Sequence, residues 1–474
     1  MLVLAIATIA WAHRDSGTAT THMPGLATLG LRSRPGWSRE ERRLGSSQLP
    51  TGPTSEAGQP VQLVASSRAR RRLQRTERTQ RAVVITVSVA LFGDVLLLLM
   101  IVPMLPSLLA PPPAGVGAAG DFALAVIFVA KDVFQLLCAP LAGALTLRYG
   151  ARASLAASLA GLTASTVAFA EAATFKQLLA ARCFQGATSS ALMSGGLTLI
   201  AETHTPDCRG AAMARANSGL GIGAALGPVL GGLLLEALGR RRTFYCVALL
   251  IGLTAVAAAA LGRAAPTTSQ PTSASMGRGE APVRQLLALV RIPAVGVACS
   301  GLFAALAAGG LFDALFGIHL SETYGIGPAR ASLIFSIEPT TYLLTLALLG
   351  GLADVVSKPV LSAAALGLVG LSLPLLTIGP SLVSVFAATL IHGIGYGCKD
   401  VVGAALLADL VDRHGAGSYA MAFALADMSD SLGYVLGPLG GVALCKALGS
   451  RTLGLSAFAL GCWVLVPSTL RLVV

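Results

Sequence analysis

The sequence predicts an all-α membrane protein with twelve transmembrane helices arranged in two six-helix bundles. Three observations support this fold class. Hydrophobic residues make up 54% of the 474 residues and charged residues only 12%, a balance typical of proteins that cross a bilayer many times. Apolar runs follow one another from residue 82 onwards, and a pattern of glycine and proline occurs once in each half of the chain.

Each apolar run is close to the ~20 residues that a helix needs to cross a bilayer core. We therefore divide the chain into a tail (1–81), an N-terminal six-helix bundle (82–262), a cytoplasmic linker (263–291) and a C-terminal six-helix bundle (292–474). The predicted spans are 82–105, 122–143, 153–171, 178–200, 211–235, 243–262, 293–317, 331–352, 359–378, 382–408, 416–444 and 452–470.

The N-terminal tail holds most of the positive charge. Of the formal net charge of +12, residues 1–81 contribute +8, from 13 arginines and five acidic residues. The densest part, Arg68 to Arg81, directly precedes the first apolar run, which indicates a topology signal rather than a nucleic-acid-binding patch. We predict a disordered cytoplasmic tail. A cleaved signal peptide over the apolar start, Met1 to Ala12, is the alternative.

Lysine and arginine near the span ends predict that both termini are cytoplasmic. The tail, the linker, the loop of Arg148 and Arg152 and the loops of Lys358 and Arg413 share one side under this scheme. The three arginines at 240–242 fall on the opposite side and do not fit it.

One apolar stretch, Gly219 to Gly232, is unusually rich in glycine and also contains Pro228. In a soluble helix each glycine costs about 1 kcal/mol relative to alanine. In a membrane, glycine lets two helices approach closely, and Gly223, Gly227 and Gly231 fall on one face at intervals of four residues. The pattern predicts a flat face for helix packing.

The same pattern returns late in the chain. Gly437 and Pro438 repeat the first motif 210 residues after Gly227, and the loop that begins at Gly350 follows the loop that begins at Gly143 by 207 residues. Near-equal offsets at two sites indicate a duplicated unit.

Charged side chains occur inside the predicted spans, where each costs at least ~2.5 kcal/mol and so requires a reason. Asp427, Asp430 and Tyr434 share one helical face, as do Lys131 and Gln135. We predict that substrate recognition and proton coupling use Asp94, Lys131, Arg182, Asp313, Asp400, Asp427 and Asp430, and that Gln135, Tyr342 and Tyr434 line the cavity.

A buried carboxylate can take up a proton when it loses its cationic partner and release it when a cation returns. Exchange of a proton for an organic cation at such a group couples the two fluxes. Structural alternatives stay open: Lys131 forms a structural ion pair or is a direct ligand, and Lys399 neutralises the adjacent Asp400 or points away from it. We expect His392 to be a satisfied histidine at an interface rather than a proton relay.

Three motifs resemble the major facilitator superfamily: GALTLRYGAR from Gly143, RCFQG from Arg182 and the stretch Gly219 to Gly232. The third resembles the motif of drug:proton antiporters, and the pattern of intramembrane charges resembles vesicular amine transporters and related multidrug exporters. The resemblance implies roles in recognition and coupling for Asp94, Lys131, Asp400 and Asp427, and in coupling for Arg182. Leu147 and Lys399 depart from the family pattern. The residues that we expect to be structural are Gly143, Arg148, Gly150, Gly186, Gly223, Gly227, Pro228, Gly231, Asp354, Gly437 and Pro438.

We interpret Arg148, Arg152, Asp354 and Lys358 as cytoplasmic latch residues between the halves. The predicted function is proton-coupled antiport that exports or sequesters small organic molecules, cationic or amphipathic, by alternating access. Uptake of a neutral solute and a transporter-like receptor or scaffold without flux are the alternatives.

The chain contains no nucleotide-binding loop, zinc motif or nucleophile elbow, so we predict no enzyme activity, no cofactor and no metal. The expected partners are a small-molecule substrate, protons and the lipid bilayer, without nucleic acid. We expect a monomer in the plasma membrane or in a vesicle or vacuole membrane.

Overall fold

The computed structural model describes residues 59–109, 121–264, 281–326, 328–351, 356–379, 381–415 and 418–473. Within these ranges the regular elements are helices, which confirms the predicted fold class. Residues 1–82 and residues 83–474 form two separate compact units. Most of the predicted disordered tail lies outside the described residues.

The first half of the chain contains six membrane crossings in five helical elements. They are α3 (Gln59–Leu109), α4 (Asp121–Tyr149), α5 (Ala151–Glu171), α6 (Phe175–Thr203) and α7 (Pro206–Ala264). The helix α3 begins within the predicted tail, where a run rich in arginine, glutamine and leucine favours helix. Gly239 interrupts α7 with a φ of 72°, so α7 supplies two of the predicted spans.

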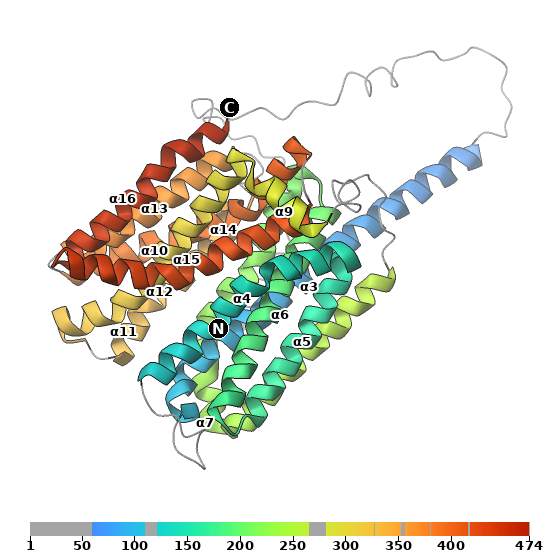
Figure 1. Cartoon of the computed structure of the whole chain (residues 1–474). Helices are drawn as coiled ribbons and strands as arrows, with labels where there is room; N and C mark the ends of the chain where they lie inside the picture. The colour runs from blue at the N-terminus through green and yellow to red at the C-terminus, as the bar shows by residue number, and fades with distance from the viewer. Residues whose placement is uncertain are drawn as a thin grey trace. The chain divides into compact units, whose positions relative to one another are not determined.

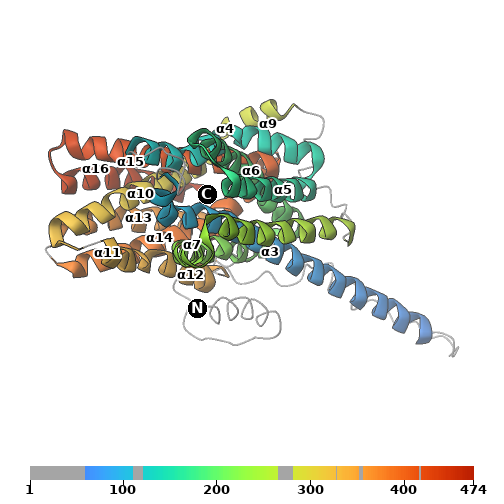
Figure 2. The same ribbon diagram turned by 90° about the horizontal axis from the view of Figure 1, so that it is seen from below.

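The second half contains the other six crossings. They are formed by α10 (Pro293–Tyr324), the pair α11 (Pro328–Phe335) and α12 (Ile337–Leu349), α13 (Lys358–Ile378), α14 (Leu382–His414), α15 (Tyr419–Ala447) and α16 (Arg451–Leu470). A short 3-10 helix, η2 (Arg471–Val473), follows. The span predicted at 331–352 is broken at Ser336, because Pro339 has no N–H to donate to the carbonyl of Phe335. Figures 1 and 2 show α10 to α16 gathered on one side and α4 to α7 on the other.

One helix lies in the predicted linker. The helix α9 (Pro282–Val290) has Gln285 and Leu289 buried, and it packs against α4, α10 and α15. The low-complexity part of the linker, which we expected to be solvated, lies outside the described residues.

Seven helices of the described part are long and apolar enough to cross a membrane by length and composition alone. The helices α6, α14 and α15 are not among them. They carry buried polar residues such as Arg182, Lys399 and Asp427, which lower their hydropathy. The break at Ser336 shortens α12. Buried charges also occur in two of the seven apolar helices, Asp94 in α3 and Lys131 in α4.

The arginines at 240–242, which did not fit the predicted topology, contact the end of α5. Arg240 Nη2 donates to the carbonyl oxygen of Ala172 at 2.9 Å, and Arg241 pairs with Glu171. A cation beside the last carbonyls of a helix is favourable because of the helix dipole. These contacts give Arg240 and Arg241 a structural role at the turn of α7.

The predicted glycine faces pack each helix against the first helix of its own half. A Cβ at Gly223 would lie 2.9 Å from the carbonyl oxygen of Phe92 on α3, and a Cβ at Gly437 would lie 2.6 Å from the backbone of Ala307 on α10. Contacts this short leave no room for a side chain. The duplicated motif therefore makes the same kind of contact, α7 on α3 and α15 on α10.

Replacing Gly231 by leucine is expected to reduce the yield of folded protein severely, because a Cβ there would lie 2.8 Å from the Cα of Met100. Gly232→Leu is the matched control, since a Cβ at Gly232 meets nothing within 4 Å. Size-exclusion profiles and thermal unfolding of the two purified variants measure the difference. Equal behaviour of the two variants would contradict the packing role of Gly231.

Candidate functional site

A cavity of about 30 Å³ lies between the two halves. A space of this size holds one or two water molecules. Three carboxylates and one ammonium line it, together with apolar and amide groups from α6, α7, α10, α14 and α15. The lining residues are Met193, Leu197, Asn217, Leu302, Lys399, Asp400, Gly403, Ala404, Phe423, Ala426, Asp427 and Asp430.

Asp427 on α15 connects the halves at this cavity. Its side chain is buried, and its Oδ1 accepts a hydrogen bond from Gln135 Nε2 on α4 at 2.6 Å. Its Oδ2 is also buried, and the Ser190 hydroxyl of α6 lies near the carboxylate. Gln135 and Ser190 are therefore polar neighbours of Asp427 from the first half.

Lys399 on α14 forms the positive centre of the cavity. Its Nζ lies 2.8 Å from Asp400 Oδ1 and 3.3 Å from Asp430 Oδ2, so it joins α14 to α15. Tyr342 donates its hydroxyl to Asp400 Oδ2 at 2.7 Å, and Asn217 Nδ2 donates to the backbone carbonyl of Asp400 at 3.1 Å. The predicted residues Tyr342, Asp400 and Asp430 thus lie in one network, and Lys399 neutralises Asp400 locally.

The predicted charges of the first half form separate contacts. Ser189 donates to Asp94 Oδ1 at 2.5 Å, and Lys131 pairs with its neighbour Asp132 at 3.7 Å. Arg182 is fully buried. Its Nη1 donates to Gln185 Oε1 at 2.8 Å and its Nε donates to the carbonyl of Ile127 at 3.2 Å. Asp132 was not predicted, although its position beside Lys131 was a signal for it.

Three further titratable side chains, Asp313, His392 and Tyr434, lie in the second half. Tyr434 donates to Asp313 Oδ2 at 3.4 Å, a long hydrogen bond between α15 and α10. His392 is buried, stacks on Phe312 with ring centres 4.3 Å apart, and has Nδ1 2.9 Å from the Ser372 hydroxyl. Its Nε2 has no partner among the described residues, so His392 is only half satisfied.

A second charged network, which the sequence analysis missed, joins the halves where α6 ends and α7 begins. Arg209 Nη1 lies 2.9 Å from Asp412 Oδ2, and its Nη2 donates to the Tyr419 hydroxyl at 3.0 Å. Lys358 Nζ lies 2.5 Å from Asp409 Oδ2, and Arg209 approaches the other oxygen of Asp409 at 3.7 Å. We call these five residues the Arg209 network.

Several glycine residues of the predicted motifs pack helices together. A Cβ at Gly143 would lie 2.8 Å from the Cβ of Ala424 on α15, so α4 and α15 touch across the two halves there. Gly186 packs against the backbone of Lys131, and Gly150 ends α4 with a φ of 88°. Among the predicted latch residues, Lys358 belongs to the Arg209 network, and Asp354 lies outside the described residues.

Two segments of the sequence, residues 83–317 and 297–473, match the model of one protein family, the Major Facilitator Superfamily. The chain belongs to the Major Facilitator Superfamily. Members of this superfamily are membrane transporters.

Two amine transporters are similar to about two thirds of this chain. The chain is 29% identical over 325 residues to the chromaffin granule amine transporter of Homo sapiens. This alignment covers 68% of this chain and 60% of that protein. It is 28% identical to the synaptic vesicular amine transporter of Bos taurus, over 68% of this chain and 61% of that protein. The alignments span about three fifths of the length of these relatives.

A solved structure supports the fold of this superfamily member. The crystal structure of the human organic anion transporter MFSD10 (TETRAN) matches with a TM-score of 0.69 at 18% sequence identity. The match covers 82% of this chain and 99% of that chain. At this identity the likeness shows the fold alone.

Proposed function

We propose that the protein is a proton-coupled antiporter that moves small organic cations by alternating access. The observation that carries the proposal is the composition of the central cavity: three carboxylates face one ammonium, and one carboxylate oxygen, Asp430 Oδ1, is buried without a donor among the described residues. A buried acceptor without a donor costs about 1–3 kcal/mol. Either a proton or the N–H of a cationic cargo removes this cost.

Exchange at Asp427 couples the two fluxes. A protonated Asp427 carries no charge and cannot bind a cation tightly, whereas the ionised carboxylate can hold either an ammonium or, after exchange, a proton. The two ligands exclude each other at one oxygen pair. Gln135 holds Oδ1 from the other half, so occupancy of Asp427 changes a contact between the halves. Binding and movement are linked through that hydrogen bond.

The Arg209 network acts in this proposal as the gate at one end of the cavity. It joins α7 of the first half to α14 and α15 of the second through the buried guanidinium of Arg209 and the partly exposed carboxylates that it contacts. Lysine and arginine near the span ends favour the cytoplasmic side for this end, with both termini cytoplasmic. When this cytoplasmic gate is closed, the cavity can be reached only from the opposite side of the membrane, which is a plasma, vesicle or vacuole membrane. The cycle requires the gate to break and reform.

Both relatives are named as amine transporters, which supports a cationic cargo. The charge of the cavity supports it independently. A neutral solute would require none of the three carboxylates, and a receptor without flux would not require an exchangeable proton site.

Reconstituted full-length protein tests the proposal. Liposomes with an imposed pH gradient are expected to accumulate organic cations from a panel of monoamines, polyamines and quaternary toxic cations on the acidic side. Accumulation is expected to stop when nigericin collapses the gradient, because the proton supplies the driving force. Flux of a neutral solute alone, or accumulation that survives loss of the gradient, would contradict proton-coupled antiport.

A further inference from the structure

The ammonium of Lys399 sits in a complete site for an alkylammonium ion. Two carboxylates hold it, Asp400 at 2.8 Å and Asp430 at 3.3 Å, and the Tyr396 ring lies beneath it at 5.5 Å from Nζ to the ring centre. Two anions and an aromatic face are the features that recognise an organic cation. The site is occupied by a group of this protein's own chain.

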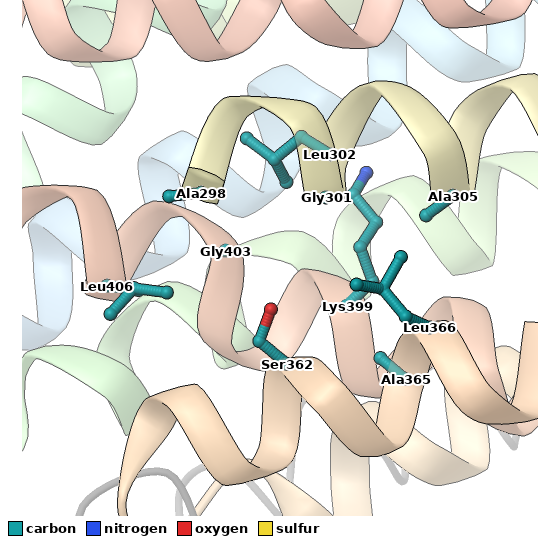
Figure 3. A pocket seen from close by; sticks show the side chains of 10 residues that line it. All are labelled: Ala298, Gly301, Leu302, Ala305, Ser362, Ala365, Leu366, Lys399, Gly403 and Leu406. Atoms are coloured by element: carbon teal, nitrogen blue, oxygen red, sulfur yellow. The ribbon is translucent and has the colours of Figure 1, made fainter. Parts of the chain in front are cut away.

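A second, smaller cavity lies on the other side of the same lysine. It has a volume of about 10 Å³, is bounded by α10, α13 and α14, and is lined mainly by small residues that include Gly301, Ala305 and Ala365. Figure 3 shows Lys399 extending from α14 towards Gly301 and Ala305, with Ser362 of α13 facing the same space. The volume suits one water molecule or an ammonium head of similar size.

Lys399 therefore lines both the central cavity and this smaller cavity. Its stem has four rotatable carbon bonds, so the ammonium can leave the carboxylates without backbone movement. Small side chains around the second cavity give it space, and the Ser362 hydroxyl is a polar group within that space. The carboxylates can thus exchange one cation for another.

We propose that Lys399 is a tethered competitor for the cargo, and that the transported molecule is an organic ammonium ion that displaces it from Asp400, Asp430 and Tyr396. This assignment deepens the proposed function and rests on it for the direction of transport. It makes Lys399 a specificity-determining residue. A group tethered by one side chain competes at a far higher effective concentration than a free cation, so only cations that bind the carboxylates better than a lysine can enter.

Chemical rescue tests whether the site accepts a free ammonium ion. Full-length Lys399→Ala is expected to be stabilised by n-butylammonium, which has the size and charge of the missing side chain, with a rise of about 3 °C or more in the unfolding midpoint at saturation. Wild-type protein, the exposed-site control Lys446→Ala and the neutral probe 1-butanol are expected to show no such rise. Absence of the n-butylammonium effect in folded Lys399→Ala would overturn the proposal.

Affinity measurements test the competition itself. Lys399→Met keeps the apolar stem and removes the charge, and it is expected to bind phenethylammonium about tenfold or more tightly than wild type, whereas Lys446→Met is unchanged. Unchanged or weaker binding by Lys399→Met would overturn the proposal. Binding of benzoate by wild type that Lys399→Met loses would also overturn it, since Lys399 would then be the ligand of an anionic cargo.

The two hypotheses fail separately. If wild type shows no gradient-driven flux but n-butylammonium still stabilises Lys399→Ala, antiport is refuted and the ammonium site remains supported. Normal flux without rescue refutes the role of Lys399 alone.

Discussion

Replacing Asp427 by asparagine is expected to reduce proton-driven accumulation of organic cations by at least ~100-fold, the effect typical of removing a positioned proton-transfer group. Asparagine keeps an acceptor for Gln135 Nε2, which is 2.6 Å from Asp427 Oδ1, and has nearly the same shape. It cannot ionise. Initial uptake rates in liposomes with an acidic interior, normalised to the amount of inserted protein, measure the loss.

Asp207→Asn is the matched control, because Asp207 is exposed at the start of α7 and lies outside the cavity. It is expected to transport like wild type. Asp94→Asn extends the test to the first half, where Ser189 donates to the carboxylate at 2.5 Å. If Asp94→Asn and Asp427→Asn both retained gradient-driven flux, the coupling mechanism would be wrong.

Replacing Arg209 by methionine is expected to have the second largest effect, a loss of about 1.5–3 kcal/mol in the stability of the state with this end closed, the range for hydrogen bonds to charged groups. The side chain of Arg209 is 2% exposed, and its removal leaves the charge of Asp412 without its partner from α7. The closed gate then no longer holds the halves together. We expect a large fall in the transport rate and faster labelling of a cysteine introduced at the cavity residue Ala426 from the side of the Arg209 network.

Arg215 provides the control, since it lies on the same helix but is exposed. Arg215→Met is expected to leave transport and labelling unchanged. Arg209→Lys keeps the charge for Asp412 but loses the fork that also reaches Tyr419, so an intermediate effect is expected. Wild-type labelling and transport in Arg209→Met would show that the network does not hold the gate.

The spans and their duplication could be predicted because they depend on local properties. Apolar length fixed the crossings, and the interval between Gly227 and Gly437 revealed the repeat. The break at Ser336 required only attention to Pro339, which removes a backbone donor. The helix α9 was hidden because a low-complexity stretch precedes it in the sequence.

The partners of the buried charges could not be predicted in the same way. Helical spacing places Asp427 and Asp430 on one face but does not say which helix that face meets. The pairing of Lys399 with Asp430 depends on the rotation of α14 against α15. The role of Arg209 was not predicted, because the topology rule already explains a basic residue near a span end and no other sequence signal indicates a gate.

The packing of α7 on α3 and of α15 on α10 has a consequence for how the transporter moves. In both pairs backbone touches backbone, with Gly223 against Phe92 and Gly437 against Ala307, and such contacts cannot slide without a clash. In the proposed alternating-access cycle, each pair is therefore expected to rotate as a rigid unit. The contacts that change during the cycle are then the side-chain contacts between the halves, which can break and reform one at a time.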